Sequence, residues 1–235
     1  MSPTVLLVHG AFADGSAWNK VIAHLREAGI SARAVPNQLR GLTADGEYVA
    51  SAVAQTPGDV VLVGHSYGGP VVTYAGSAAD NVKALVLLAA FGLDKGENAL
   101  DAPKDFPPSE LGEALQPWSY PGSEVPEFTL QLDKYRSVFA ADVTDEEAAA
   151  GAANQRPASG IAFGEPLSVE PAWKHLPTWW VIPGADNAIS PEYQKATAAR
   201  IGAKATVLEG GSHSSAISRS REVADVIIEA VRSVA

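Results

Sequence analysis

The stretch VVLVGHSYGG at residues 60–69 constrains the fold of this chain more than any other. Its four leading apolar residues, three of them valines, predict a buried strand. A Gly-x-Ser-x-Gly turn follows at once, with Ser66 between Gly64 and Gly68, and a helical pattern resumes after Pro70. Side chains at the two glycines would collide across so tight a turn. A strand, a sharp turn and a helix in this order predict a nucleophile elbow, with the serine hydroxyl above the sheet.

Apolar runs and helical patterns alternate on both sides of this elbow. Continuous apolar strands that alternate with helices predict a parallel sheet covered by helices on both faces. The C-terminal residues 217–234 show core-facing apolar spacing and predict a final helix. We therefore expect an α/β fold. The other runs that predict strands are 5–8, 30–35, 82–89, 178–182 and 205–208.

Residues 92–171 interrupt the alternation. The segment is rich in proline and aromatic residues, and its clearest helix start is Thr144-Asp145-Glu146-Glu147 before an alanine run. An insert this long within a compact domain is usually functional, and its aromatic content argues against disorder. We expect residues 1–235 to form a single domain in which 92–171 make a small, mostly helical cap over the carboxyl edge of the sheet.

Composition narrows the classes of partner and chemistry. With 27 Asp and Glu against 17 Lys and Arg, the formal net charge is −10, which disfavours nucleic acid and anionic membranes as partners. The chain has no cysteine, so disulfides and thiolate catalysis are excluded. No basic leader precedes the first apolar run, which is too short to span a bilayer. These features favour a cytoplasmic enzyme with a small-molecule substrate and leave its oligomeric state open.

The serine of the elbow needs a base, and the base needs an acid that holds its tautomer. On an elbow of this kind the partners follow in the chain order Ser, Asp or Glu, His. Asp186 and His213 fit this order, since each lies in a loop directly after a predicted strand. Because the carboxyl ends of parallel strands share one edge, we expect Ser66, Asp186 and His213 to meet there. Asp94, in another edge loop, is the rival acid.

The other histidines are given structural roles. We expect His65 to pack beneath the elbow and His9 to fix its own loop by hydrogen bonds. No HExxH or similar ligand spacing is present, so neither a metal nor a cofactor is implied.

An oxyanion formed during ester cleavage needs rigid N–H donors. One is the backbone N–H of Tyr67, directly after the serine, and the other comes from the loop after the first strand. Ala11 is the favoured residue in that loop, and Phe12 is the alternative. Apolar residues in the cap and edge loops are the candidates for substrate binding. They are Phe12, Trp18, Phe91, Trp118 and Tyr120.

Several motifs resemble the α/β-hydrolase superfamily, in particular its compact branch of plant methyl-ester esterases and hydroxynitrile lyases. They are LLVHGAFADGSAW, VLVGHSYGG, LVLLAAF, PGADNAIS and EGGSHS, and they extend through the whole chain. The resemblance implies about six parallel strands, because this chain starts near the third of the family's eight. It also implies Ser66, Asp186 and His213 as the triad, with Ala11 and Tyr67 as oxyanion donors.

Two positions separate esterase from lyase within this branch. The hydroxynitrile lyases of this branch have a Thr at the second position of the His-Gly loop and a Lys directly after the catalytic His. At these positions this chain has Gly10 and Ser214. Without that cation a departing cyanide is not stabilised. We therefore favour a serine hydrolase that cleaves a small to medium carboxylic ester through an acyl-enzyme. The alternatives are a lyase, a cofactor-free oxygenase, a small-molecule receptor or an inactive hydrolase on the same fold.

Overall fold

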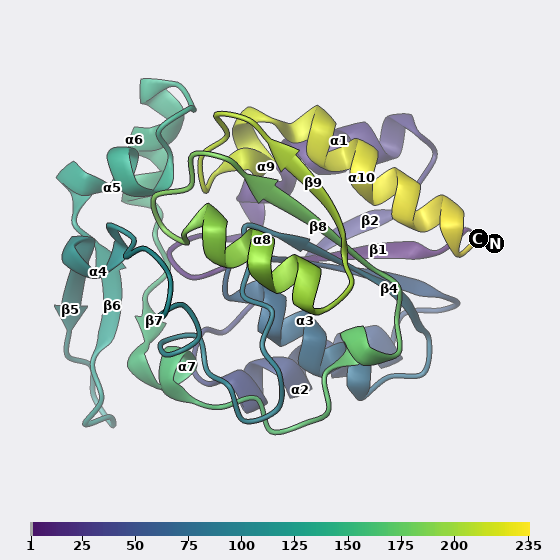
Figure 1. Ribbon diagram of the computed structural model, residues 1–235, viewed down its shortest axis with the longest axis horizontal. Helices are drawn as coiled ribbons and strands as arrows, with labels where there is room; N and C mark the ends of the chain where they lie inside the picture. Colours follow the sequence, from purple (N-terminus) through teal and green to yellow (C-terminus); the bar gives the residue numbers. More distant parts are fainter. Residues whose placement is uncertain (1) are drawn as a thin grey trace.

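A six-stranded parallel sheet forms the centre of the molecule (Figure 1). The computed structural model describes residues 2–235. The strands lie in the order β2-β1-β3-β4-β8-β9, and every neighbouring pair is parallel. The sequence therefore predicted the fold class and the strand number correctly. The strands are β1 (Thr4–Val8), β2 (Ala32–Val35), β3 (Val60–His65), β4 (Val82–Leu88), β8 (Thr178–Pro183) and β9 (Lys204–Leu208).

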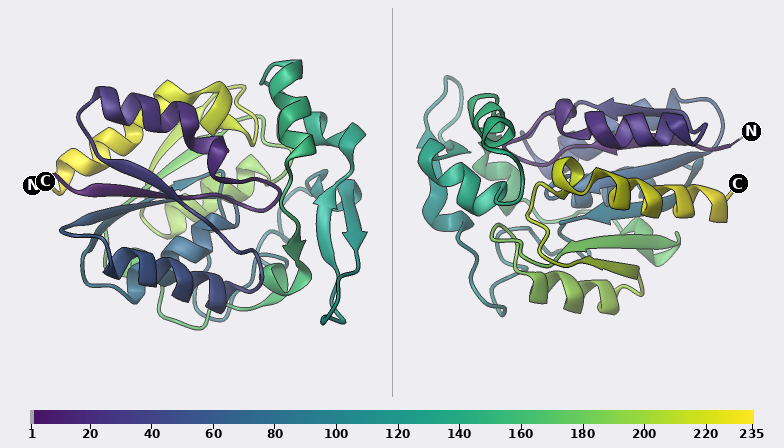
Figure 2. Two further views of the ribbon diagram at one scale, coloured as in Figure 1. Left: turned by 180° about the vertical axis from the view of Figure 1, so that it is seen from behind. Right: turned by 90° about the horizontal axis from the view of Figure 1, so that it is seen from above.

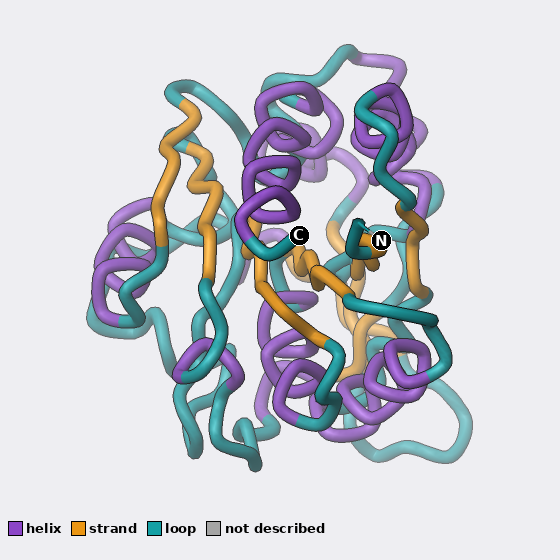
Figure 3. The backbone as a smooth tube through the Cα atoms, turned by 90° about the vertical axis from the view of Figure 1, so that its right-hand side faces the viewer, coloured by secondary structure: helices purple, strands orange, loops and turns teal. Residues whose placement is uncertain are grey.

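Helices cover both faces of the sheet (Figure 3). Each face has its own apolar core. One face carries α2 (Leu42–Ala54), α3 (Gly68–Ser77) and α8 (Pro191–Arg200). The other carries α1 (Asn19–Glu27) and α10 (Ser220–Ser233), with the short α9 (Ser215–Ser218) before it. The final helix is thus shorter than the expected 217–234. No helix among residues 2–235 is both long and apolar enough to cross a membrane.

Local capping follows the sequence at some helices and departs from it at others. Thr144 forms a capping box with Glu147 at the start of α6 (Asp145–Ala153), and Ser190 caps α8 with proline at its first position. The N-terminal turn, a 3-10 helix over Gly15–Trp18, is capped by Asp14, whose side chain accepts the N–H of Ser16. At α2 the cap position is Gly41, with no side-chain cap.

The cap segment lies at the end of the sheet opposite the C-terminus and the start of β1 (Figures 1 and 2). Beside its helices it contains a three-stranded antiparallel sheet, β5-β6-β7, which the sequence analysis does not predict. These strands are short, and Pro117 lies inside one of them. The sequence therefore shows no alternation of apolar and polar residues there. The elements are α4 (Leu111–Ala114), β5 (Leu115–Trp118), β6 (Glu127–Leu130), α5 (Leu132–Phe139), α6, β7 (Ala158–Ser159) and α7 (Gly160–Gly164).

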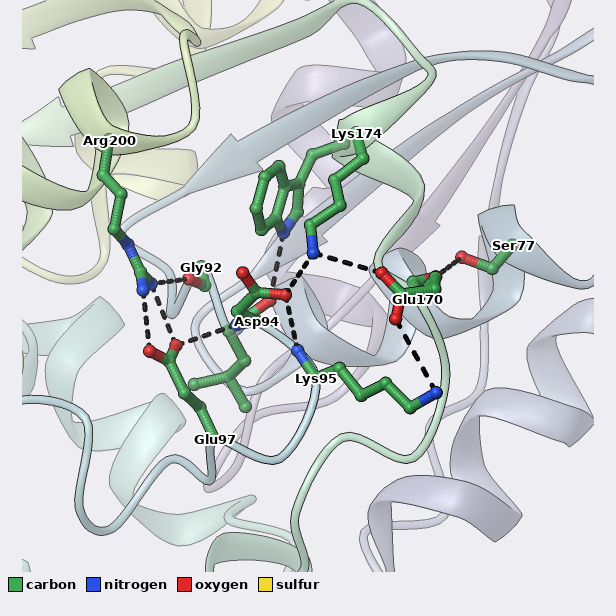
Figure 4. Close-up of polar contacts among 10 residues, drawn as sticks. Ser77, Gly92, Asp94, Lys95, Glu97, Glu170, Lys174 and Arg200 are labelled. Atoms are coloured by element: carbon green, nitrogen blue, oxygen red, sulfur yellow. Dashed lines mark hydrogen bonds and ion pairs between the residues drawn. The ribbon is translucent and has the colours of Figure 1, made fainter.

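The two ends of the cap segment are joined to each other where they leave and rejoin the sheet (Figure 4). Asp94 pairs with Lys174 at 2.7 Å, and Lys95 pairs with Glu170 at 3.6 Å. Backbone bonds link Leu167 with Gly96 at 2.8 Å and with Glu97 at 2.9 Å. Glu97 in turn binds Arg200 of α8 through both carboxylate oxygens. The cap is therefore anchored to the main sheet at its base.

Candidate active site

Ser66 lies between β3 and α3, in the strand–turn–helix geometry that its sequence predicts. Its φ of 55° is in the left-handed region, which is strained for a residue with a side chain. The turn is tight enough that a Cβ on Gly64 would lie 2.4 Å from the main-chain oxygen of Gly68. A Cβ on Gly10 would lie 2.6 Å from the Cβ of Ser66. The glycines of both loops are thus required by close packing at the elbow.

Asp186 and His213 lie side by side, as predicted. Nδ1 of His213 is 3.0 Å from Oδ1 and 2.9 Å from Oδ2 of Asp186, and both side chains are buried. The carboxylate also accepts the N–H groups of Ala188 and Ile189, at 2.8 and 2.9 Å. These bonds orient the carboxylate of Asp186 toward the imidazole. Because the carboxylate only accepts, the proton of His213 lies on Nδ1 and Nε2 is the unprotonated ring nitrogen. The rival acid Asp94 lies at the base of the cap, in its ion pair with Lys174.

Gln194 of α8 is a further partner of Asp186 that the sequence analysis missed. Its Nε2 donates to Oδ2 of Asp186 at 2.8 Å and to the main-chain oxygen of Ile189 at 2.9 Å. The side chain is fully buried. The only sign of this role in the sequence is that Gln194 lies one helical turn after the Ser190 cap. A glutamine at such a position does not by itself indicate a contact with Asp186.

The residue next to Ser66 binds the loop of His213. His65 donates from Nε2 to the main-chain oxygen of His213 at 3.0 Å, and the two ring centroids are 4.7 Å apart. Burial lowers the pKa of His65 well below 6.5, so the ring is neutral and keeps its other nitrogen unprotonated. The expectation that His65 packs beneath the elbow is confirmed. Within residues 2–235 the Ser66 hydroxyl makes no hydrogen bond with a side chain, His213 included.

The loop after β1 is fixed by His9, as expected. Its Nε2 accepts the N–H of Asn37 at 3.1 Å, so Nδ1 carries the proton and donates to the main-chain oxygen of Gly10 at 2.9 Å. Burial lowers the pKa of His9. The backbone N–H groups of Ala11 and Phe12 make no hydrogen bond within the described part of the chain. Either is free to donate to a ligand.

Tyr67 occupies the cap position of α3, and its N–H also has no acceptor within residues 2–235. Its hydroxyl donates to Oδ2 of Asp45 at 2.8 Å. Asp45 is buried, and desolvation raises its pKa. Asp45 lies in the first turn of α2, and its carboxylate accepts the backbone N–H of Arg40 and the hydroxyl of Tyr67. Asp45 thus fixes the side chain next to the elbow serine.

A largely apolar cavity of about 670 Å³ lies between the cap and the edge of the sheet. Phe163, one of its lining residues, has its ring centroid 6.1 Å from that of Phe12 and 5.9 Å from that of Tyr67. The cavity therefore adjoins the elbow. Ala188 and Ile189, which follow Asp186, form part of its wall. Other lining residues are Phe91, Leu100, Phe106, Leu111, Leu115 and Phe128.

The structure separates the five predicted substrate-binding residues. Phe91 lines this cavity, and Phe12 lines a second one of about 260 Å³ between α1 and the cap. Trp18 is fully buried in the core on the opposite face of the sheet, against the ring of His65. Trp118 is 55% exposed on the cap sheet, and Tyr120 stacks beneath Arg40. Neither Trp118 nor Tyr120 lines either cavity. The predictions for Trp18, Trp118 and Tyr120 are corrected accordingly, because aromatic type alone does not tell a core or surface position from a pocket wall.

No group of three or more His, Asp or Glu side chains within residues 2–235 has the geometry to hold a metal ion. The chemistry available at the elbow is that of a serine hydroxyl, an imidazole with its carboxylate, and free backbone N–H groups.

The model of the alpha/beta hydrolase family matches residues 5–226 of this sequence. The chain belongs to the alpha/beta hydrolase family. Among curated proteins, a carbendazim hydrolyzing esterase from Nocardioides sp. (strain SG-4G) is 35% identical over 117 residues. That match covers 44% of this chain and 48% of the relative, so it spans about half the length of each.

Solved structures of two hydrolytic enzymes resemble the chain over nearly its whole length. Polyneuridine aldehyde esterase has a TM-score of 0.83 at 19% identity, covering 97% of this chain and 99% of that one. A pyrethroid hydrolase from Sphingobium faniae JZ-2 has a TM-score of 0.80 at 19% identity, covering 99% and 98%. At these identities the likeness establishes the alpha/beta hydrolase fold alone.

Proposed function

We propose that this protein is a serine hydrolase that cleaves small to medium carboxylic esters through an acyl-enzyme. The observation that supports this most is the buried Asp186–His213 pair, bonded through His65 to the strained elbow that presents Ser66. The names of the relatives, an esterase that hydrolyses carbendazim and a pyrethroid hydrolase, agree with ester hydrolysis.

Ser66 is the nucleophile in this proposal. His213 takes its proton at Nε2 as Oγ attacks the ester carbonyl, and Asp186 stabilises the imidazolium that forms. The N–H groups of Tyr67 and Ala11 bind the oxyanion, with Phe12 as the alternative to Ala11. His213 then returns the proton to the leaving alkoxide, and the same steps with water release the acid. No cofactor takes part.

The cavity indicates the substrate class. A volume of about 670 Å³ is within the range of sites for drug-sized ligands, and its phenylalanine, leucine and proline lining suits an apolar group. Residues 92–171 hold fifteen Asp or Glu against five Lys or Arg, so the whole formal net charge of −10 lies in the cap. We infer a preference for neutral apolar esters over anionic ones, because the cap repels a negative substrate.

The residue after His213 favours hydrolysis over elimination of cyanide as the reaction. Ser214 follows His213, and its hydroxyl donates to the main-chain oxygen of Phe139 at 2.9 Å. It therefore supplies no cation for a departing anion. The acidic surface fits a cytoplasmic enzyme that acts on small molecules rather than on nucleic acid or an anionic membrane.

A fluorophosphonate probe tests the proposal directly, because it reacts only with an activated serine. We expect stoichiometric labelling of the purified protein, with the adduct on Ser66 in peptide mass spectrometry and none in Ser66→Ala. Absence of labelling, or an adduct elsewhere, would contradict the proposed nucleophile. Turnover of a p-nitrophenyl ester separates an esterase from a receptor, which reacts once or not at all.

A further inference from the structure

The loop that carries His213 is bonded to the cap on both sides of the histidine. Ser212 donates its hydroxyl to Oδ1 of Asp142. Ser214 donates its hydroxyl to the main-chain oxygen of Phe139 at 2.9 Å. Both acceptors belong to one short cap segment, 139–142, at the end of α5. The two immediate neighbours of the proposed base are therefore held by the same part of the cap.

Asp142 makes a second bond to this loop. Its Oδ2 accepts the hydroxyl of Ser218, in α9, at 2.8 Å. One carboxylate thus bridges a residue before His213 and a residue after it, and Ser212 also accepts the N–H of Ser214 at 3.2 Å. Hydrogen bonds to an ionised acceptor are about twice as strong as neutral ones, so this bridge restrains both ends of the turn.

The cap also packs on the imidazole itself. The ring centroid of Phe139 lies 4.5 Å from that of His213 in an edge-to-face arrangement. On its other sides the histidine is held by Asp186 at Nδ1 and by His65 at its main-chain oxygen. The core of the fold therefore fixes one side of His213, and segment 139–142 fixes the other.

We propose that Asp142 is a positioning residue that makes the alignment of His213 depend on the seating of the cap. This inference rests on the proposed function. Asp142 touches no reacting atom. It acts through the serines around His213, and its removal leaves the loop held only by Phe139 and by the core contacts.

The test compares Asp142→Ala and Asp142→Asn with a matched control, Asp145→Ala. Asp145 lies three residues away in the same cap, and its replacement removes the same charge. Among residues 2–235 its side chain makes only an exposed ion pair with Arg136, at 2.8 Å. For an ester substrate we expect Asp142→Ala to lower kcat by about 10-fold with KM within about twofold, since small misplacements of a catalytic group reduce rate steeply. Asp142→Asn recovers most of the rate, because its amide oxygen still accepts a hydroxyl, and Asp145→Ala keeps the wild-type rate.

A second readout does not require turnover. The Nδ1–H proton of His213, bonded to Asp186, is expected to give a downfield proton NMR signal in the wild-type protein. We expect this signal to broaden in Asp142→Ala and to stay sharp in Asp145→Ala. The inference is overturned if the signal and kcat of Asp142→Ala match those of Asp145→Ala. If the wild-type protein labels with fluorophosphonate and turns over ester while this match is seen, the proposed function stands and only the role of Asp142 fails. If the wild-type protein does neither, the proposed function fails, and the NMR comparison alone decides the role of Asp142.

Discussion

His65 donates its Nε2 proton to the main-chain oxygen of His213 at 3.0 Å. The bond joins the residue before the elbow serine to the residue proposed as its base, across 148 positions of sequence. It requires a proton on Nε2, and burial keeps the ring neutral by lowering the pKa of His65. The elbow and the loop after β9 are therefore fixed to each other by a buried, neutral histidine.

Stability is expected to fall as pH drops through the range just below 6.5. The pKa values of His65 and His9 are lowered in the folded chain by burial, so the unfolded chain binds more protons between the folded and unfolded values. The free energy of unfolding then rises with pH in that window and reaches its full value above it. Each histidine contributes at most about 1.4 kcal/mol per pH unit. Urea unfolding at pH 7.5 and 5.5 measures the loss, and the difference should shrink in His65→Gln. An equal loss in both proteins would assign the pH dependence to other groups.

Asp186→Asn is expected to reduce kcat by about 10³- to 10⁴-fold, because an amide holds the imidazole in the wrong tautomer. Gln194→Leu removes one donor to the same carboxylate while Ala188 and Ile189 still hold it. Its rate should fall by much less, and its free energy of unfolding by about 1–3 kcal/mol. Steady-state kinetics on both variants gives the order. A Gln194→Leu enzyme as slow as Asp186→Asn would show that the orientation of Asp186 depends on Gln194 alone.

Gly10→Ala should slow ester cleavage without a change in the catalytic groups. The added Cβ would lie 2.6 Å from the Cβ of Ser66 and 2.9 Å from the main-chain oxygen of His65, so the elbow has to shift. We expect a loss of about 10²-fold in kcat/KM and about 1–3 kcal/mol in the free energy of unfolding. Gly164→Ala is the control, since its Cβ would meet nothing within 4 Å. Wild-type kinetics for Gly10→Ala would refute the close packing at the elbow.

The cavity predicts a preference for longer acyl or alcohol groups. Burial of each added methylene is worth about 0.8 kcal/mol, so kcat/KM should rise about fourfold per carbon from p-nitrophenyl acetate until the cavity is filled. Gly112 lines this cavity, and a Cβ there would meet nothing within 4 Å. Gly112→Phe should fill the space, reducing the rate for long esters while the acetate rate stays unchanged. A flat chain-length profile in the wild-type protein would place the substrate elsewhere.

The sequence predicted the main sheet and the Asp186–His213 contact because both depend on local patterns. Buried parallel strands are continuous apolar runs, and the chain order of Ser, Asp and His follows from the elbow. Loops after strands of one parallel sheet meet at one edge, so Asp186 and His213 could be brought together without knowing any distance.

The contacts that surround this pair were not legible in the sequence. Gln194, Asp142 and the Tyr67–Asp45 bond depend on which helix or cap segment packs against which loop, and side-chain type does not encode that. Trp18 and Trp118 show the same limit, since one tryptophan fills the core and the other lies exposed on the cap sheet. The cap sheet itself is formed by strands of two to four residues, too short to show a period.

Hydrolysis of p-nitrophenyl butanoate by the wild-type protein and by Ser66→Ala tests the central claim most directly. Circular dichroism confirms that both chains are folded. We expect steady-state turnover by the wild-type protein and a kcat at least about 10³-fold lower in Ser66→Ala, since the nucleophile is lost and only oxyanion binding remains. Equal rates in the two proteins would contradict the claim.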